Sequence, residues 1–239
     1  MNIQTMPRYI GLNGLKMPQV IKPFLLIDML LCVVYLANHM LGKPYSAITT
    51  LLDLDGEHGL GMWYSSMQLF CIFLLSFFFC YTKFRQDKKL LPLMILPLLF
   101  LLLSIDEAIQ IHEWLGNQTD NLLVGHSRNN TPFKETGIWM FAVGIPFAIF
   151  FMAYADSIKH HFQSNQQAFK KLLLGMTIML TGAIGMETLV NFISHEYSFF
   201  EVALEESLEM VGATIMLWAA YDMALDTLAA HPGLLTKRD

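Results

Sequence analysis

The sequence predicts an all-α protein, a polytopic membrane bundle of six transmembrane helices with both termini in the cytoplasm. Three observations support this prediction: an apolar composition, six apolar segments long enough to cross a bilayer, and basic residues that gather at one set of segment ends. Hydrophobic residues make up 54% of the 239 residues and charged residues only 15%, whereas soluble domains average about 25% charged residues. Lipid is therefore the expected solvent for most of the chain.

The apolar segments cover residues 23–41, 62–82, 90–112, 137–156, 171–193 and 202–225. A bilayer core about 30 Å thick is crossed by about 20 helical residues, so each segment is long enough to span it. The segments are continuous apolar blocks, which argues against a β-barrel, whose strands alternate apolar and polar residues. The connections between them are short, and residues 1–239 are expected to form a single transmembrane domain.

The third segment contains Pro92 and Pro97. Spanning helices tolerate proline where neighbouring helices or polar groups satisfy the freed carbonyls, so a kink is expected here. The stretch 116–135 that follows this segment is rich in Asn, Thr, Asp and Gly. It is expected to form a polar connector.

Lysine and arginine predict the orientation, because positive charge near the ends of spans is retained in the cytoplasm. Twelve basic residues lie at one set of ends, and three lie at the other, namely Lys43, Arg128 and Lys134. This bias places both termini inside. If the host is a bacterium, the chain is then a multi-pass protein of the inner (plasma) membrane.

Polar side chains collect at the outer end of the third segment, which closes with Asp106, Glu107, Gln110, His112 and Glu113. Successive residues of a continuous helix turn by about 100°, which puts Asp106, Gln110 and Glu113 on one face. Glu107 flanks this face. His112 is expected to point away from it.

The fifth and sixth segments carry two further polar stripes. Glu187, Asn191 and His195 follow one another at spacings of four at the outer end of the fifth segment, so they share a face. The sixth segment begins with four glutamates in nine residues, namely Glu201, Glu205, Glu206 and Glu209. The outer ends of the first two segments add Asn38, His39, Glu57 and His58. Five of the six spans are thus expected to bring polar groups to one depth.

Part of this charge is compatible with ordinary helix ends in the headgroup region, and Glu57, His58, Glu113 and Glu201 fit that explanation about as well as any other. Asp106, Glu187 and Glu209 fit it less well, because apolar sequence flanks each of them. An unpaired carboxylate at such a position costs a few kcal/mol. No lysine or arginine lies in the outer half of any span. These carboxyl groups are expected either to hold protons or to share a cation.

A metal ion shared between helices is the preferred hypothesis, because carboxylates and imidazoles that converge from several helices are the usual ligands of a site inside a bundle. Iron, zinc or manganese suits these ligand types better than magnesium or calcium if a histidine takes part. No Glu-x-x-His spacing occurs in the chain, which disfavours a ferritin-like di-iron centre. The candidate ligands are Asp106, Glu107, His112, Glu113, Glu187, His195, Glu205 and Glu209.

Two classes of function remain open. The first is a membrane metalloenzyme, either a hydrolase acting on a lipid-linked substrate or an oxidoreductase, since both use open coordination positions on a metal. The second is a non-enzymatic protein, either an accessory subunit that binds other membrane subunits or a proton or cation carrier. The lipid bilayer is a partner in both, and the absence of a basic stripe argues against nucleic acid. Asp28 and Asp222 lie near the inner ends of their spans and are interpreted as solvated or hydrogen-bonded, with the continuation of a proton path from the outer carboxyl groups as the alternative.

Overall fold

The computed structural model describes residues 16–54, 59–123, 127–134, 136, 138–193 and 197–231, without the side chains of Glu113, Asn130 and Ser164. Every element in these ranges is helical, which confirms the predicted all-α class. This part of the chain contains six helical segments that are long and apolar enough to cross a membrane. Their composition and length are those of a multi-pass membrane protein.

The six spans coincide closely with the predicted segments. The first, second and sixth are the single helices α1 (Lys22–Met40), α3 (Leu60–Gln86) and α9 (Ser198–Ala230). The third is a 3₁₀ segment, η2 (Lys88–Met94), followed by α4 (Ile95–Ile109). The fourth consists of η4 (Met140–Gly144), α6 (Ile145–Ile158) and η5 (Lys159–Asn165), and the fifth of α7 (Gln166–Leu180), η6 (Thr181–Met186), α8 (Glu187–Leu189) and η7 (Val190–Phe192).

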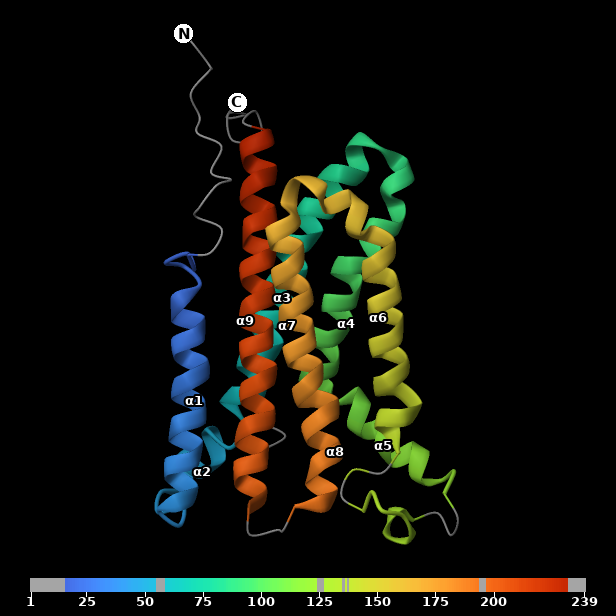
Figure 1. Cartoon of the computed structure of the whole chain (residues 1–239). Helices are drawn as coiled ribbons and strands as arrows, with labels where there is room; N and C mark the ends of the chain where they lie inside the picture. The colour runs from blue at the N-terminus through green and yellow to red at the C-terminus, as the bar shows by residue number, and fades with distance from the viewer. Residues whose placement is uncertain are drawn as a thin grey trace.

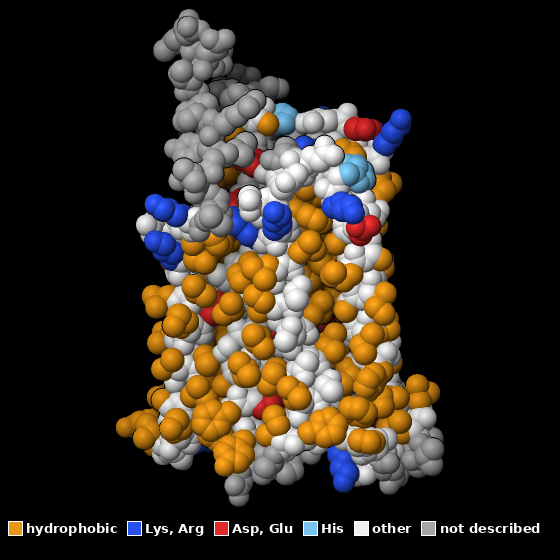
Figure 2. Space-filling view, viewed as in Figure 1, with side chains coloured by type: hydrophobic (Ala, Val, Ile, Leu, Met, Phe, Trp, Pro, Cys, Tyr) orange, Lys and Arg blue, Asp and Glu red, His pale blue; other side chains and the backbone are white. Residues whose placement is uncertain are grey.

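Three short helices lie in the connections, namely α2 (Ser46–Leu51), α5 (Ile111–Asp120) and η3 (Arg128–Asn130). The spans run side by side, and α1 begins at the same end of the bundle at which α9 ends (Figure 1). On the face drawn in Figure 2, basic side chains gather mainly at that end, beside a broad belt of hydrophobic side chains. The basic residues, which the sequence concentrates at one set of span ends, therefore also gather at one end of the folded molecule.

The central helix is α9, which packs against α7, α3 and α1. Its contact with α7 is the closest in the bundle, because glycines face each other there. A Cβ atom on Gly212 would lie 2.6 Å from the Gly175 carbonyl oxygen, and one on Gly175 would lie 2.6 Å from the Gly212 oxygen. Helix backbones approach this closely only where the facing residues have no side chain.

The prolines of the third span lie in and next to a 3₁₀ segment, and a polar group of another helix reaches the carbonyls beside them. Pro92 lies in the 3₁₀ segment η2 that precedes α4, and Pro97 has no N–H to offer the carbonyl of Leu93. The Tyr154 hydroxyl of α6 lies 3.0 Å from the Pro92 carbonyl oxygen and 3.4 Å from that of Leu93. A polar group from another helix thus reaches the Leu93 carbonyl and its neighbour, and ties α6 to the third span.

Two carboxyl groups interpreted as residues near inner span ends have specific partners. Asp222 accepts a hydrogen bond from the Lys171 Nζ at 2.6 Å, and the same ammonium lies 3.8 Å from the centre of the Trp218 ring. Asp28 is only 1% exposed and accepts a hydrogen bond from Thr214, near the middle of α9. The interpretation of Asp28 as hydrogen-bonded is therefore confirmed, and its partner Thr214 belongs to another span.

Candidate functional site

A cavity of about 760 Å³ lies within the bundle, and its walls come from the second to sixth spans together with α5 and the connections near it. Its chemistry differs between its two parts. Carboxyl groups from three separate spans line one part, namely Asp106, Glu107, Glu187, Glu205, Glu206 and Glu209. The sequence stripes of the third, fifth and sixth spans therefore do converge on one space.

The other part of the cavity is apolar. It is lined by leucines of α4, phenylalanines of α6 and apolar residues of α7, among them Leu99, Leu103, Phe147, Met179 and Leu180. Leu102 and Phe150 also line it, and they are 60% and 48% exposed. The apolar part is thus open to the surroundings between α4 and α6.

Asp106 and His112 are brought together by a reversal of the chain at Gln110. This residue has left-handed backbone angles, with φ 54° and ψ 49°, and it ends α4 before α5 begins. The Asp106 carboxylate accepts a hydrogen bond from the His112 backbone N–H at 2.8 Å, and its other oxygen lies 3.0 Å from His112 Nδ1. The prediction that the helix continues through residue 112 with His112 pointing away was therefore wrong.

The glutamates of α9 lie at a second close contact between that helix and the fifth span. A Cβ atom on Gly182 would lie 2.8 Å from the Glu205 backbone oxygen and 2.9 Å from Glu209 Cγ. Because Gly182 has no side chain, the backbone of Glu205 and the side chain of Glu209 can pack against it, and both residues line the cavity. Glu201, in the first turn of the same helix, is only 4% exposed, so its side chain faces the interior of the bundle.

Glu187 is held between two π-helical segments, η4 and η6. Trp139, which directly precedes η4, donates its indole N–H to Glu187 Oε1 at 3.3 Å, and Glu187 directly follows η6. Residues of both segments line the cavity, including Gly144 and Ile184. Single π-helical turns inside α-helices are frequent at functional sites, and nothing in the sequence pattern indicated them.

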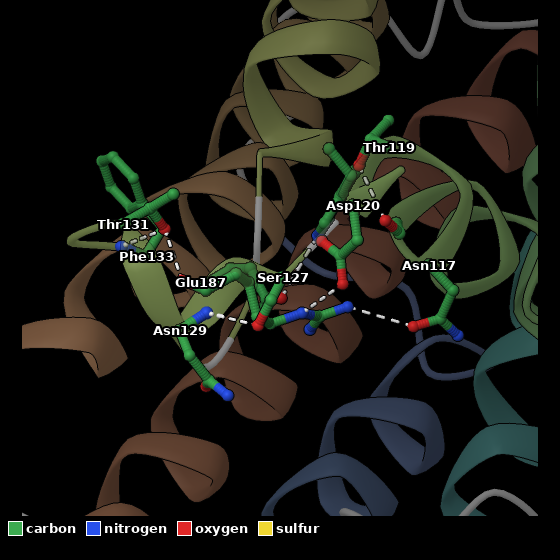
Figure 3. A network of polar contacts seen from close by, with 11 residues as sticks. Asn117, Thr119, Asp120, Ser127, Asn129, Thr131, Phe133 and Glu187 are labelled. Carbon is green, nitrogen blue, oxygen red and sulfur yellow. Dashed lines mark hydrogen bonds and ion pairs between the residues drawn. The ribbon is translucent and has the colours of Figure 1, made fainter. Parts of the chain in front are cut away.

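A polar network from the connection between α5 and η3 reaches the rim of the cavity (Figure 3). Arg128 lines the cavity and donates to the Asp120 carboxylate at 2.7 Å and to Asn117 Oδ1 at 3.0 Å. Asn117 also lines the cavity. Arg128 was not expected at this site, because it lies in a polar connector, where spacing along the chain does not predict contacts.

The acidic part of the cavity carries more carboxyl groups than basic groups. Glu209 interacts electrostatically with Glu206, Glu107, Glu187 and Asp106. Among the described residues that line the cavity, the basic side chains are His112 and Arg128, and each already has an aspartate partner. A ligand that brings positive charge would fit this part of the cavity.

Six of the eight candidate metal ligands line this cavity, namely Asp106, Glu107, His112, Glu187, Glu205 and Glu209. His195 and the side chain of Glu113 lie outside the described residues. Within the part of the chain that is described, no three His, Cys, Asp or Glu residues are grouped closely enough to hold a metal ion.

The polar groups of the first two spans do not join this cavity. Asn38 donates to Thr49 Oγ1 at 3.0 Å, and His39 stacks on Phe199. Glu57 and His58 lie outside the described residues. The expectation that five spans bring polar groups to one depth stays a prediction, and the cavity itself takes its carboxyl groups from three spans.

Comparison with known proteins gives one family. A family model described as Domain of unknown function (DUF8692) matches residues 25–225. No curated protein matches the chain, and no solved structure matches it.

Proposed function

The chain belongs to this family, and from its cavity we propose that it binds an amphiphilic molecule with a positively charged head group. The observation that carries the proposal is that one cavity combines a part lined by six carboxyl groups with an apolar part. The head group would lie among the carboxyl groups, and the apolar chain of the ligand would lie between α4 and α6.

The size and the opening of the cavity support this proposal. Pockets for small molecules commonly have volumes of about 300–1,000 Å³, and this cavity has about 760 Å³. Its opening near Leu102 and Phe150 belongs to an apolar span surface, so a lipid-like molecule would enter sideways from the bilayer. Such a molecule would not have to leave the hydrocarbon region.

The charges support a cationic head group over an anionic or a neutral one. A carboxylate at membrane depth costs a few kcal/mol unless it is paired, and His112 and Arg128 already pair with Asp106 and Asp120. An ammonium group would donate hydrogen bonds to two or three carboxyl groups at once. Glu205 and Glu209, which interact with each other and with Glu187, are the proposed partners.

The proposal is tested with three probes that share one alkyl chain: dodecylamine, dodecanol and dodecanoate. Each is titrated into the protein in nanodiscs of zwitterionic lipid, and tryptophan fluorescence is recorded, because Trp139 lines the cavity. Dodecylamine is expected to bind at least about tenfold more tightly than dodecanol, which corresponds to about 1.4 kcal/mol. The double substitution Glu205→Gln and Glu209→Gln is expected to remove this difference.

Matched variants distinguish binding inside the cavity from binding elsewhere on the protein. Trp139→Phe should abolish the fluorescence response, whereas replacing the exposed Trp63, which does not line the cavity, should preserve it. Asp156→Asn removes a carboxylate whose partner is Lys159 at the surface, and it should leave amine binding unchanged. Binding of dodecanoate as tight as that of dodecylamine would contradict the proposal.

A transition metal ion, namely iron, zinc or manganese, is the second candidate for the positive charge, and the chain would then be a metalloenzyme. The specific observation in its favour is that a histidine lies among the carboxyl groups, since His112 and Asp106 are in contact at the acidic part of the cavity. Imidazole with carboxylates is a ligand set that suits these three metals. In this proposal Glu113 or His195 would complete the ligand set.

Elemental analysis of detergent-purified protein tests the metal. If the cavity holds one, the protein should contain stoichiometric metal, a chelator should lower its Tm, and Glu209→Gln should reduce the metal content, because metal binding contributes to folding stability. Asp156→Asn, remote from the cavity, should retain full occupancy. A parent protein that contains no metal and whose Tm does not respond to chelator would eliminate this candidate.

A further inference from the structure

A second polar cluster lies outside the cavity, where α1 meets α3 and α9. Its centre is Asp28, whose carboxyl group is in contact with Tyr64 Oη at 2.9 Å, Gln68 Nε2 at 3.0 Å and Thr214 Oγ1 at 2.7 Å. All four side chains are buried, and none of them lines the cavity. The three partners of Asp28 are uncharged, and Tyr64 is the titratable group among them.

The hydrogen atoms available from these partners are too few for the contacts. Besides the three contacts of Asp28, Tyr64 Oη lies 2.9 Å from the Phe24 carbonyl oxygen, and Gln68 Nε2 lies 3.0 Å from Tyr64 Oη and 2.8 Å from Thr214 Oγ1. The two hydroxyls supply one hydrogen each and the amide supplies two. Six contacts therefore share four hydrogens, and a proton on Asp28 would supply a fifth.

The orientation of the Gln68 amide does not change this conclusion. As placed, Gln68 Oε1 is buried and has no hydrogen-bond partner within the described part of the chain. Exchanging the amide oxygen and nitrogen, which have nearly equal electron counts, would turn the oxygen toward the cluster. Two acceptors, the Gln68 oxygen and Asp28 Oδ1, would then lie 3.0 Å apart, and a proton on Asp28 would be needed to bridge them.

A metal ion is not the ligand that this cluster indicates. Asp28 Oδ1, Tyr64 Oη and Gln68 Nε2 form a triangle with sides of 2.9–3.0 Å, which is the spacing of hydrogen bonds. Asp28 is the carboxyl group of the cluster, and within the described part of the chain no three His, Cys, Asp or Glu residues are grouped closely enough to hold a metal ion. A proton is therefore the positive charge that this cluster can accept.

We propose that Asp28 is a proton-binding site inside the bundle, and that it docks α1 onto α3 and α9 as a neutral carboxylic acid. The bound proton lies between Asp28 Oδ1 and Tyr64 Oη, and Tyr64 in turn donates to the Phe24 carbonyl oxygen of α1. Thr214 donates to the second Asp28 oxygen and joins α9 to the same group. Removal of the proton would leave a carboxylate among neutral groups at the joint between α1 and the rest of the bundle.

Infrared spectroscopy detects the proton directly, because a protonated carboxyl group has a carbonyl stretching band that a carboxylate lacks. In nanodiscs at neutral pH, the difference spectrum between the parent and Asp28→Asn should contain one such band. The control is Asp222→Asn, which removes a carboxylate paired with Lys171 at 2.6 Å. Its difference spectrum should contain no protonated-carboxyl band.

Thermal unfolding gives a second, independent readout. Asparagine mimics a neutral acid, so Asp28→Asn should shift Tm by less than about 2 °C, whereas Asp28→Leu, which leaves three buried partners unsatisfied, should lower it by about 5 °C or more. Asp222→Asn should also lower Tm, because Lys171 would remain buried without its partner. A difference spectrum with no protonated-carboxyl band for Asp28→Asn, or a loss of Tm as large as that of Asp28→Leu, would overturn the proposal.

Discussion

Gly212→Ala is expected to destabilise the bundle strongly, although alanine is the better helix former. The new Cβ atom would lie 2.6 Å from the Gly175 oxygen and 2.7 Å from the Met179 backbone nitrogen. Both are backbone atoms of α7, so no side-chain rotation can relieve the contact and the two helices must separate. Overpacking of this kind costs about 1–3 kcal/mol, and the loss of α7–α9 packing adds to it. The change is measured as a fall in Tm or in unfolding free energy in detergent.

Gly185→Ala provides the matched control for this experiment. Its Cβ atom would meet only Thr181 Cγ2, at 3.6 Å, which is an ordinary van der Waals contact. Because glycine lowers helix stability by about 1 kcal/mol relative to alanine, this variant should be as stable as the parent or more stable. Gly175→Ala should resemble Gly212→Ala, and the two changes together should cost less than their sum, because both act on one contact. Equal stability of the Gly212 and Gly185 variants would contradict the close α7–α9 contact.

The spans could be predicted from the sequence because their signal is local. Most of the 19 residues of α1, for example, are apolar, and length and composition alone identify such a helix. The faces of α9 were also predictable, because a helix of fixed periodicity puts Glu205 and Glu209 on one side, and the structure places both in the cavity wall.

The details of the site depend on information that is not local. A left-handed residue at a helix end is usually Gly or Asn, so Gln110 gave no sign that α4 would stop there and fold His112 back onto Asp106. The depth of Asp28 depends on how far α1 slides along α9, and its contact with Thr214 joins residues 186 positions apart. Side-chain spacing within one helix does not determine either feature.

Cysteine labelling is expected to give an all-or-none result that tests the predicted orientation. Leu122 follows α5 and is 78% exposed, and Lys159 lies at the opposite end of the fourth span, also exposed. In intact cells, a membrane-impermeant maleimide should label Leu122→Cys, because the basic residues place this connection outside. It should label Lys159→Cys only after the membrane is permeabilised.

The two sites together separate insertion from orientation. If both variants are labelled in intact cells, or neither is, the fourth span does not cross the membrane between them, and the cavity could not open sideways into lipid. If Lys159→Cys alone is labelled, the span crosses in the reverse sense and the charge-based orientation is wrong. The prediction that the fourth span crosses the membrane would still be confirmed. The parent chain serves as the blank, since Cys80 is fully buried and Cys32 and Cys71 lie within spans. Labelling of Leu122→Cys alone would place the carboxyl groups near α5 toward the outer face of the membrane, where a ligand would meet them.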